Sequence, residues 1–100
     1  MTTIDWLQNW YAAQADGEWE HEYGLRIDTL DNPGWSLEID LKGTSLEAQP
    51  FEELRVDRSN SDWIHCRLED GQFRGWGGPL NLSELVEAFR EWADRAPKKG

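Results

Sequence analysis

In several stretches between residues 23 and 76, apolar side chains recur at every second position, which is the period of a half-buried β-strand; residues 44–52 are ambiguous. The pattern is clearest at residues 35–42, where Trp35, Leu37 and Ile39 alternate with polar side chains. A strand of this kind needs a covering layer on one face and tolerates water on the other. The chain is therefore expected to build an antiparallel sheet with one covered face.

Turn signals separate this region into five predicted strands. The strands are expected at residues 23–29, 35–42, 53–57, 63–68 and 72–76, and the register of the third is left open. Asn32-Pro33-Gly34 and Asp70-Gly71 are typical of tight turns, because Pro fixes φ and Gly tolerates positive φ. Short connections between successive strands predict an antiparallel meander.

Helical periodicity flanks the strands at both ends. Apolar residues three and four apart predict helices at residues 3–15 and 81–96. Asn81 is a candidate N-cap, and Glu84 three residues later suggests a capping box. Two amphipathic helices can cover one sheet face, so residues 1–100 are expected to form a single two-layer α+β domain of order α-β-β-β-β-β-α, with residues 96–100 as a frayed tail.

The charge of the chain is strongly negative, with a formal net charge of −10. Residues 16–57 hold most of the excess acid, against only Arg26, Lys42 and Arg55 as bases. Nucleic acid and membrane surfaces are disfavoured as partners, and a basic protein is favoured. A lone Cys66 and the lack of a membrane-spanning apolar run point to the cytoplasm, and a monomer is expected.

Catalytic and metal chemistry find little support in the sequence. Cys66 is in phase with apolar Ile64 and Leu68, which indicates a buried structural thiol, and the neighbouring His65 should point to the opposite face. The acidic cluster at residues 16–22 matches no zinc or calcium spacing. We therefore expect no catalytic residue, no metal ligand and no cofactor.

The polar side chains of the strands should lie together on the uncovered face. Candidate binding residues on this face are Asp28, Glu38, Asp40, Asp57, Trp63 and His65. The carboxylates would supply an attractive field for a basic partner, and Trp63 would be an interface anchor beside His65.

Three stretches of the sequence resemble the Immunity protein 53 family of bacterial polymorphic-toxin systems. They are Trp19-Glu20-His21 with Tyr23-Gly24, Thr29-Leu30-Asp31-Asn32-Pro33-Gly34-Trp35, and Gly77-Gly78-Pro79 with Asn81-Leu82. The resemblance implies a cytosolic, non-enzymatic protein that binds and neutralises a cognate toxin. Glu20 and His21 join the candidate contacts, because polar residues flanked by aromatics in a loop are either structural or contacting groups.

Two further hypotheses stay open. The resemblance and the negative charge together favour a basic nuclease-type toxin, since a nuclease must be basic where it grips phosphate. A different class of function would be a small-molecule or glycan-binding domain, or an enzyme, that uses Trp63 and His65 as a shallow site. Self-association through the open face is the least favoured, because it would stack many acids.

Overall fold

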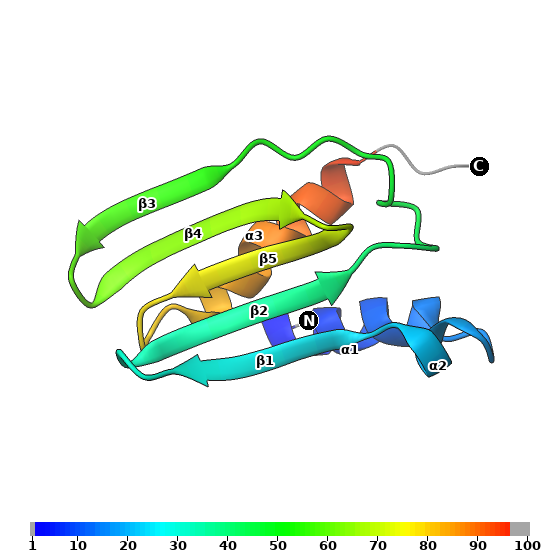
Figure 1. The fold of residues 1–100 in the computed structure, drawn as a ribbon, viewed down its shortest axis with the longest axis horizontal. Coiled ribbons are helices and arrows are strands. Elements are labelled where there is room, and N and C mark those ends of the chain that lie inside the picture. The colour runs from blue at the N-terminus through cyan, green and yellow to red at the C-terminus, as the bar shows by residue number, and fades with distance from the viewer. Residues whose placement is uncertain (1, 97–100) are drawn as a thin grey trace.

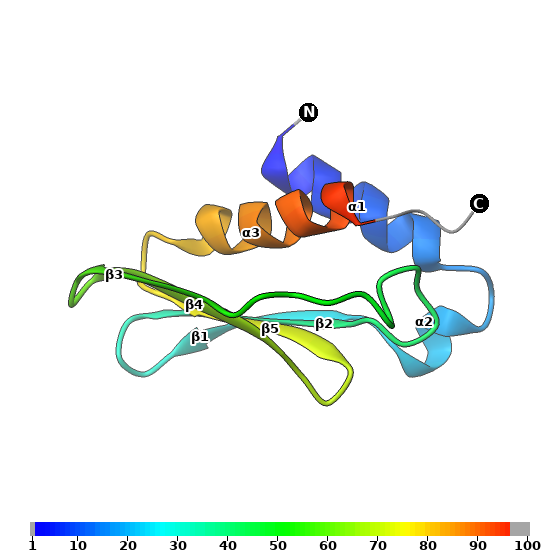
Figure 2. The same ribbon diagram turned by 90° about the horizontal axis from the view of Figure 1, so that it is seen from above.

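The computed structural model describes residues 2–96, which form an open antiparallel sheet with two long helices on one face (Figures 1 and 2). The elements in chain order are α1 (Thr3–Gln14), α2 (Trp19–Glu22), β1 (Leu25–Leu30), β2 (Gly34–Asp40), β3 (Leu54–Ser59), β4 (Asp62–Glu69), β5 (Gln72–Gly77) and α3 (Leu82–Arg95). The predicted α+β fold class is confirmed. The tail predicted at residues 96–100 lies, apart from Ala96, outside the described residues.

The strand order is β1-β2-β5-β4-β3, so the predicted simple meander is wrong. Each hairpin forms as the turn signals predict, but β5 inserts between β2 and β4. The connection at residues 41–53 carries the chain from β2, next to one edge of the sheet, to β3 at the opposite edge (Figure 1). A connection of this length can make that crossing, whereas a tight turn could only place β3 next to β2.

The core lies between the sheet and the layer formed by α1 and α3. Phe89 of α3 is fully buried, and its ring contacts those of Trp10 at 5.0 Å and Phe73 at 5.1 Å between centroids. Edge-to-face contacts of this kind add to the roughly 1.5–3 kcal/mol gained by burying a Phe side chain. Leu37 and Ile39 are the fully buried residues of β2, as the alternation predicts.

A short helix, α2, interrupts the stretch expected to be an acidic connector. Its Trp19 is only 7% exposed, and the indole Nε1 donates to the carbonyl oxygen of Lys42 at 2.8 Å. Asp16 holds the turn before the helix, because its Oδ1 accepts from the backbone N–H groups of Glu18 and Trp19. The acidic segment is thus tied to the core by one aromatic side chain.

None of the helices within residues 2–96 has the length and apolarity needed to cross a lipid bilayer.

Candidate functional site

The sheet face opposite the helices holds the six strand residues predicted as contacts. Cross-strand pairing places Asp28 opposite Ser36, Glu38 opposite Arg26, and Trp63 opposite Asp57. These side chains alternate with those that point into the core, which confirms their expected placement on the uncovered face.

This open face is mixed in charge, because arginines lie on it beside the carboxylates. Arginines from four strands lie on it, namely Arg26, Arg55, Arg67 and Arg74. Arg74 comes from β5, whose facing was not assigned from the sequence. The signal was available, since Phe73 and Gly75 pack into the core and leave Gln72, Arg74 and Trp76 for the other side.

Trp76 forms the middle of an aromatic cluster on the open face. The guanidinium carbon of Arg67 lies 5.1 Å from the Trp76 ring, and the His65 ring lies 5.7 Å from it. His65 Nε2 is shielded from water and lies 3.3 Å from a carboxylate oxygen of Glu53, without hydrogen-bond geometry. The His65 ring is therefore packed among its neighbours on the open face.

A groove of about 420 Å³ lies where α2 meets the open face. It is lined by Glu20, His21, Glu22, Tyr23, Gly24, Leu25, Arg26, Glu38, Asp40, Gln72 and Arg74. Figure 2 shows α2 at one end of the sheet, beyond the helix layer. The groove brings together four of the predicted contact residues, two from α2 and two from β2.

Two of these four residues have structural tasks. The Asp40 carboxylate accepts from the Gly24 backbone N–H at 2.9 Å and from Gln72 Nε2 at 2.7 Å, which fixes the start of β1. The Glu20 carboxylate accepts from the backbone N–H groups of Asp16 and Gly17. Both carboxylates are therefore satisfied within the chain, which reduces what they can offer a partner.

Glu22, Glu38 and His21 are groove residues left free for contact, and Arg26 beside them is the free cation of the described groove. Within residues 2–96, neither carboxylate has a hydrogen-bond or ion-pair partner, and His21 is exposed. Glu22 was passed over in the sequence, because nothing local distinguished it from the other acids of the 16–22 cluster. Only the tertiary structure shows that Glu22 lines the same groove as Glu38.

Asp57 and Trp63 lie at the other end of the strands. Glu69 is paired with Gln72 at the groove end, and Trp63 lies six positions earlier on β4, which corresponds to about 20 Å of strand. The predicted contacts thus form two groups on one face. The groove group is Glu20, His21, Glu38 and Asp40, and the corner group is Asp57, Trp63 and His65; Asp28 lies on the edge strand β1.

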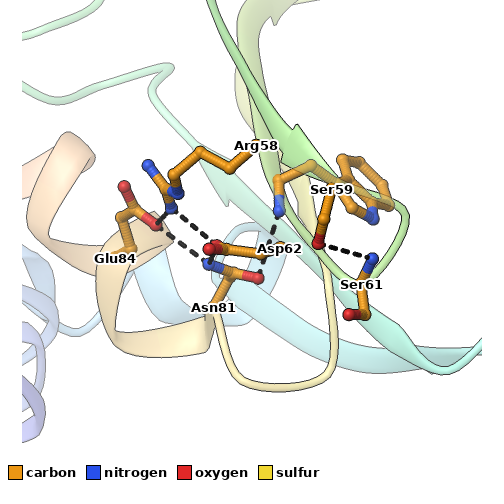
Figure 3. Close-up of polar contacts among 7 residues, drawn as sticks. Arg58, Ser59, Ser61, Asp62, Asn81 and Glu84 are labelled. Atoms are coloured by element: carbon orange, nitrogen blue, oxygen red, sulfur yellow. Dashed lines mark hydrogen bonds and ion pairs between the residues drawn. The ribbon is translucent and has the colours of Figure 1, made fainter.

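A polar network holds this corner against α3 (Figure 3). The Asn81 side chain accepts from the Trp63 backbone N–H at 3.3 Å and donates to the carboxylates of Asp62 at 2.9 Å and Glu84 at 3.0 Å. The predicted capping box is therefore wrong: Asn81 bonds across to β4 because it is buried beneath the β3–β4 hairpin.

Arg58 completes the network by pairing with both carboxylates. Its guanidinium lies 2.8 Å from Asp62 and also bonds Glu84. These hydrogen bonds hold the pKa of Asp62 and of Glu84 below their usual values and raise the pKa of Arg58. Both carboxylates are therefore ionised at neutral pH. Through Asn81 they help to hold the backbone at Trp63.

A family model for Immunity protein 53 matches residues 4–94. The chain belongs to the Immunity protein 53 family. The match spans α1 to the last turn of α3, so it includes the groove group and the corner group alike. Neither the curated proteins nor the solved structures compared with the chain match it.

Nucleophilic chemistry at Cys66 is disfavoured in this Immunity protein 53 member. The thiol is fully buried, and burial raises its pKa to about 12, so the reactive thiolate is scarce at neutral pH. The thiol is a structural group, as its phase in the sequence predicted. Within residues 2–96, no three His, Cys, Asp or Glu side chains are gathered in a way that could hold a metal ion.

Proposed function

We propose that this chain acts in the cytoplasm by binding and neutralising a cognate toxin, without catalysis of its own. The observation that carries the proposal is the family match over residues 4–94. Immunity proteins work by occluding or capturing a toxin, so the relevant feature is a surface and not a reactive centre. The open face is the surface with the strongest support.

Two of the unpaired carboxylates on this face lie at the groove. Glu22 and Glu38 are unpaired there, whereas Arg67 and Arg74 are paired with Glu69. Unpaired carboxylates attract a basic partner over longer distances than paired ones, because a neighbouring guanidinium cancels the field. A basic nuclease-type toxin, whose phosphate-binding groove carries Lys and Arg, is the partner that fits this charge.

The two residue groups on the open face can be covered by one partner. A standard protein–protein interface buries about 800 Å² on each side, which is a patch about 30 Å across. The groups lie about 20 Å apart along the strands, and the molecule measures 41 Å in its longest dimension. We therefore place Trp63 as an aromatic anchor and Glu22 and Glu38 as the charged rim of a single toxin contact.

Charge reversal at the groove tests this proposal. Glu22→Lys and Glu38→Lys should each weaken capture of the toxin encoded beside this protein, measured as the association rate constant at low salt. Glu91→Lys makes the same charge change on the exposed side of α3 and should leave capture almost unchanged. Equal effects from all three variants would mean that only net charge matters and would contradict the assignment of the groove.

Failure to bind the neighbouring gene product would favour the other class of function. The open face carries the half-buried Trp63 and Trp76, and indoles on a surface are a common platform for sugars and other planar or apolar ligands. A ligand that quenches tryptophan fluorescence in the wild type and not in Trp63→Ala would support that reading.

A further inference from the structure

The two edges of the sheet are protected to different degrees. At the β3 edge, the pairing register shifts between Asp57 and Ser59, and such irregularities discourage another strand from adding. The β1 edge pairs with β2 in unbroken register from Leu25 to Leu30 and carries no proline. Figure 1 shows both strands at the margins of the sheet. An unprotected edge of this kind is a template for strand pairing.

The backbone groups that point out of the β1 edge can be identified from the ladder. The Asp40 N–H donates to the carbonyl oxygen of Gly24, so this pair is a hydrogen-bonded one. Hydrogen-bonded and non-hydrogen-bonded pairs alternate along an antiparallel ladder, which turns the N–H and C=O groups of Arg26 and Asp28 toward β2. The groups of Leu25, Ile27 and Thr29 therefore face outward.

We infer that β1 pairs with β1 of a second copy of this chain, antiparallel and centred on Ile27. In this register Ile27 lies opposite Ile27, and Leu25 lies opposite Thr29, so every outward N–H and C=O group of these residues is matched. Arg26 then lies opposite Asp28 of the second copy, twice by symmetry. Within residues 2–96, neither Arg26 nor Asp28 has an ion-pair partner, although both are exposed.

Charge selects this register over its neighbours. Side chains stay on the same face of the sheet only if one strand shifts against the other by an even number of residues. A step in one direction places Arg26 opposite Arg26, and a step in the other places Asp28 opposite Asp28. Like charges directly opposite each other are destabilising. The register centred on Ile27 is therefore favoured, because it matches the backbone hydrogen-bonding groups and also places opposite charges face to face.

An apolar groove of about 340 Å³ runs beside the same edge. It lies between α1 and β1, and its walls include Ile4, Tyr11 and Ile27, which are 52%, 39% and 36% exposed. Pairing of the two β1 strands brings the grooves of both copies together and covers this apolar surface on the helix side. On the open face only Arg26 and Asp28 at the edge take part, with opposite charges facing each other, so the stacking of acids that argued against self-association does not arise.

Sedimentation of the isolated protein from about 1 µM to about 1 mM tests the inference, at about 0.15 M salt to screen the net charge. Arg26→Asp should raise the dimer dissociation constant by about tenfold, since two attractive pairs become repulsive. Arg26→Asp/Asp28→Arg restores opposite charges and should recover the wild-type value. Arg55→Asp, with the same charge change on the β3 edge, should have no effect.

Amide hydrogen exchange gives a second readout that does not depend on the variants. With rising concentration, exchange should slow at Leu25, Ile27 and Thr29 and stay unchanged at Arg26 and Asp28. A protein that remains monomeric at the highest concentration would overturn the inference, as would a dimer that Arg26→Asp leaves intact. No toxin is present in either experiment, so these outcomes are independent of the proposed neutralising function.

Discussion

At the scale of single residues, acidic side chains that look alike in the sequence divide into structural and available groups. Asp40 anchors Gly24 and Gln72, whereas Glu38, two positions earlier on the same face, bonds nothing within the described chain. The distinction matters for mutagenesis. A change at Asp40 would lower stability and binding together, and its effect on capture would not identify a contact.

Alanine substitutions at Asp40 and Glu38 test this distinction between a structural and an available carboxylate. Asp40→Ala should lower the free energy of unfolding by about 1–2 kcal/mol, because two hydrogen bonds are lost and their donors are left unpaired. Glu38→Ala should change it by less than about 0.5 kcal/mol. Urea unfolding of the two variants measures the difference, and equal losses would contradict the structural role of Asp40.

Arg58 predicts a pH dependence of stability. It lowers the pKa of Asp62 and Glu84 below their ordinary values of 3.8 and 4.5, so the stabilisation is present above those values and is lost as pH falls through the lowered pKa values. Arg58→Met should lower the melting temperature at pH 7. The difference in melting temperature between this variant and the wild type should become smaller below about pH 4. Thermal unfolding across this range would reject the network as a source of stability if this difference stayed constant.

At the scale of elements, the connection from β5 to α3 passes very close to the backbone of the β3–β4 hairpin. Gly78 leads from β5 toward α3, and a Cβ there would overlap the backbone carbonyl oxygen of Ser61 in the β3–β4 hairpin. This contact and the Asn81 network together bind the hairpin to the start of α3. The element that presents Trp63 is therefore held by backbone packing as well as by charge.

Alanine substitutions at Gly78 and Gly24 compare a glycine in close backbone contact with one that has free space around it. Gly78→Ala should destabilise the fold by about 2 kcal/mol or more, since backbone atoms must shift to admit the methyl group. Gly24→Ala is the matched control, because a Cβ at Gly24 has no atom within 4 Å. Chemical denaturation of both variants measures the contrast, and similar stabilities would show that the hairpin moves away at little cost.

At the scale of the whole molecule, the net charge of −10 acts on encounter rather than on fold. At the centre of the open face Arg67 and Arg74 are paired with Glu69, and the free carboxylates of Glu22 and Glu38 lie at the α2 end. A basic partner would therefore approach in a preferred orientation.

Salt dependence of toxin capture follows from this arrangement. Raising ionic strength from about 0.05 M to about 0.5 M should lower the association rate constant by about tenfold or more and change the dissociation rate far less, because screening acts on long-range attraction. Stopped-flow mixing at several salt concentrations measures both. A salt-independent association rate would exclude electrostatic steering by the groove.

The sequence by itself determined the local structure of this protein. Period-two alternation predicted the strands and their faces, helical spacing predicted α1 and α3, and the turn at Asn32-Pro33-Gly34 predicted the first hairpin, because each is a property of neighbouring residues. The phase of Cys66 likewise predicted its burial.

Only the tertiary structure decided which distant segments meet. It placed β5 between β2 and β4, brought Trp19 into the core from an acidic stretch, and set Glu22 in the same groove as Glu38. Strand order and groove lining depend on contacts between residues far apart in the chain, and a periodic pattern is the same whichever neighbour a strand acquires. The physical reason is that alternation fixes the face of a side chain and leaves the partner strand to packing.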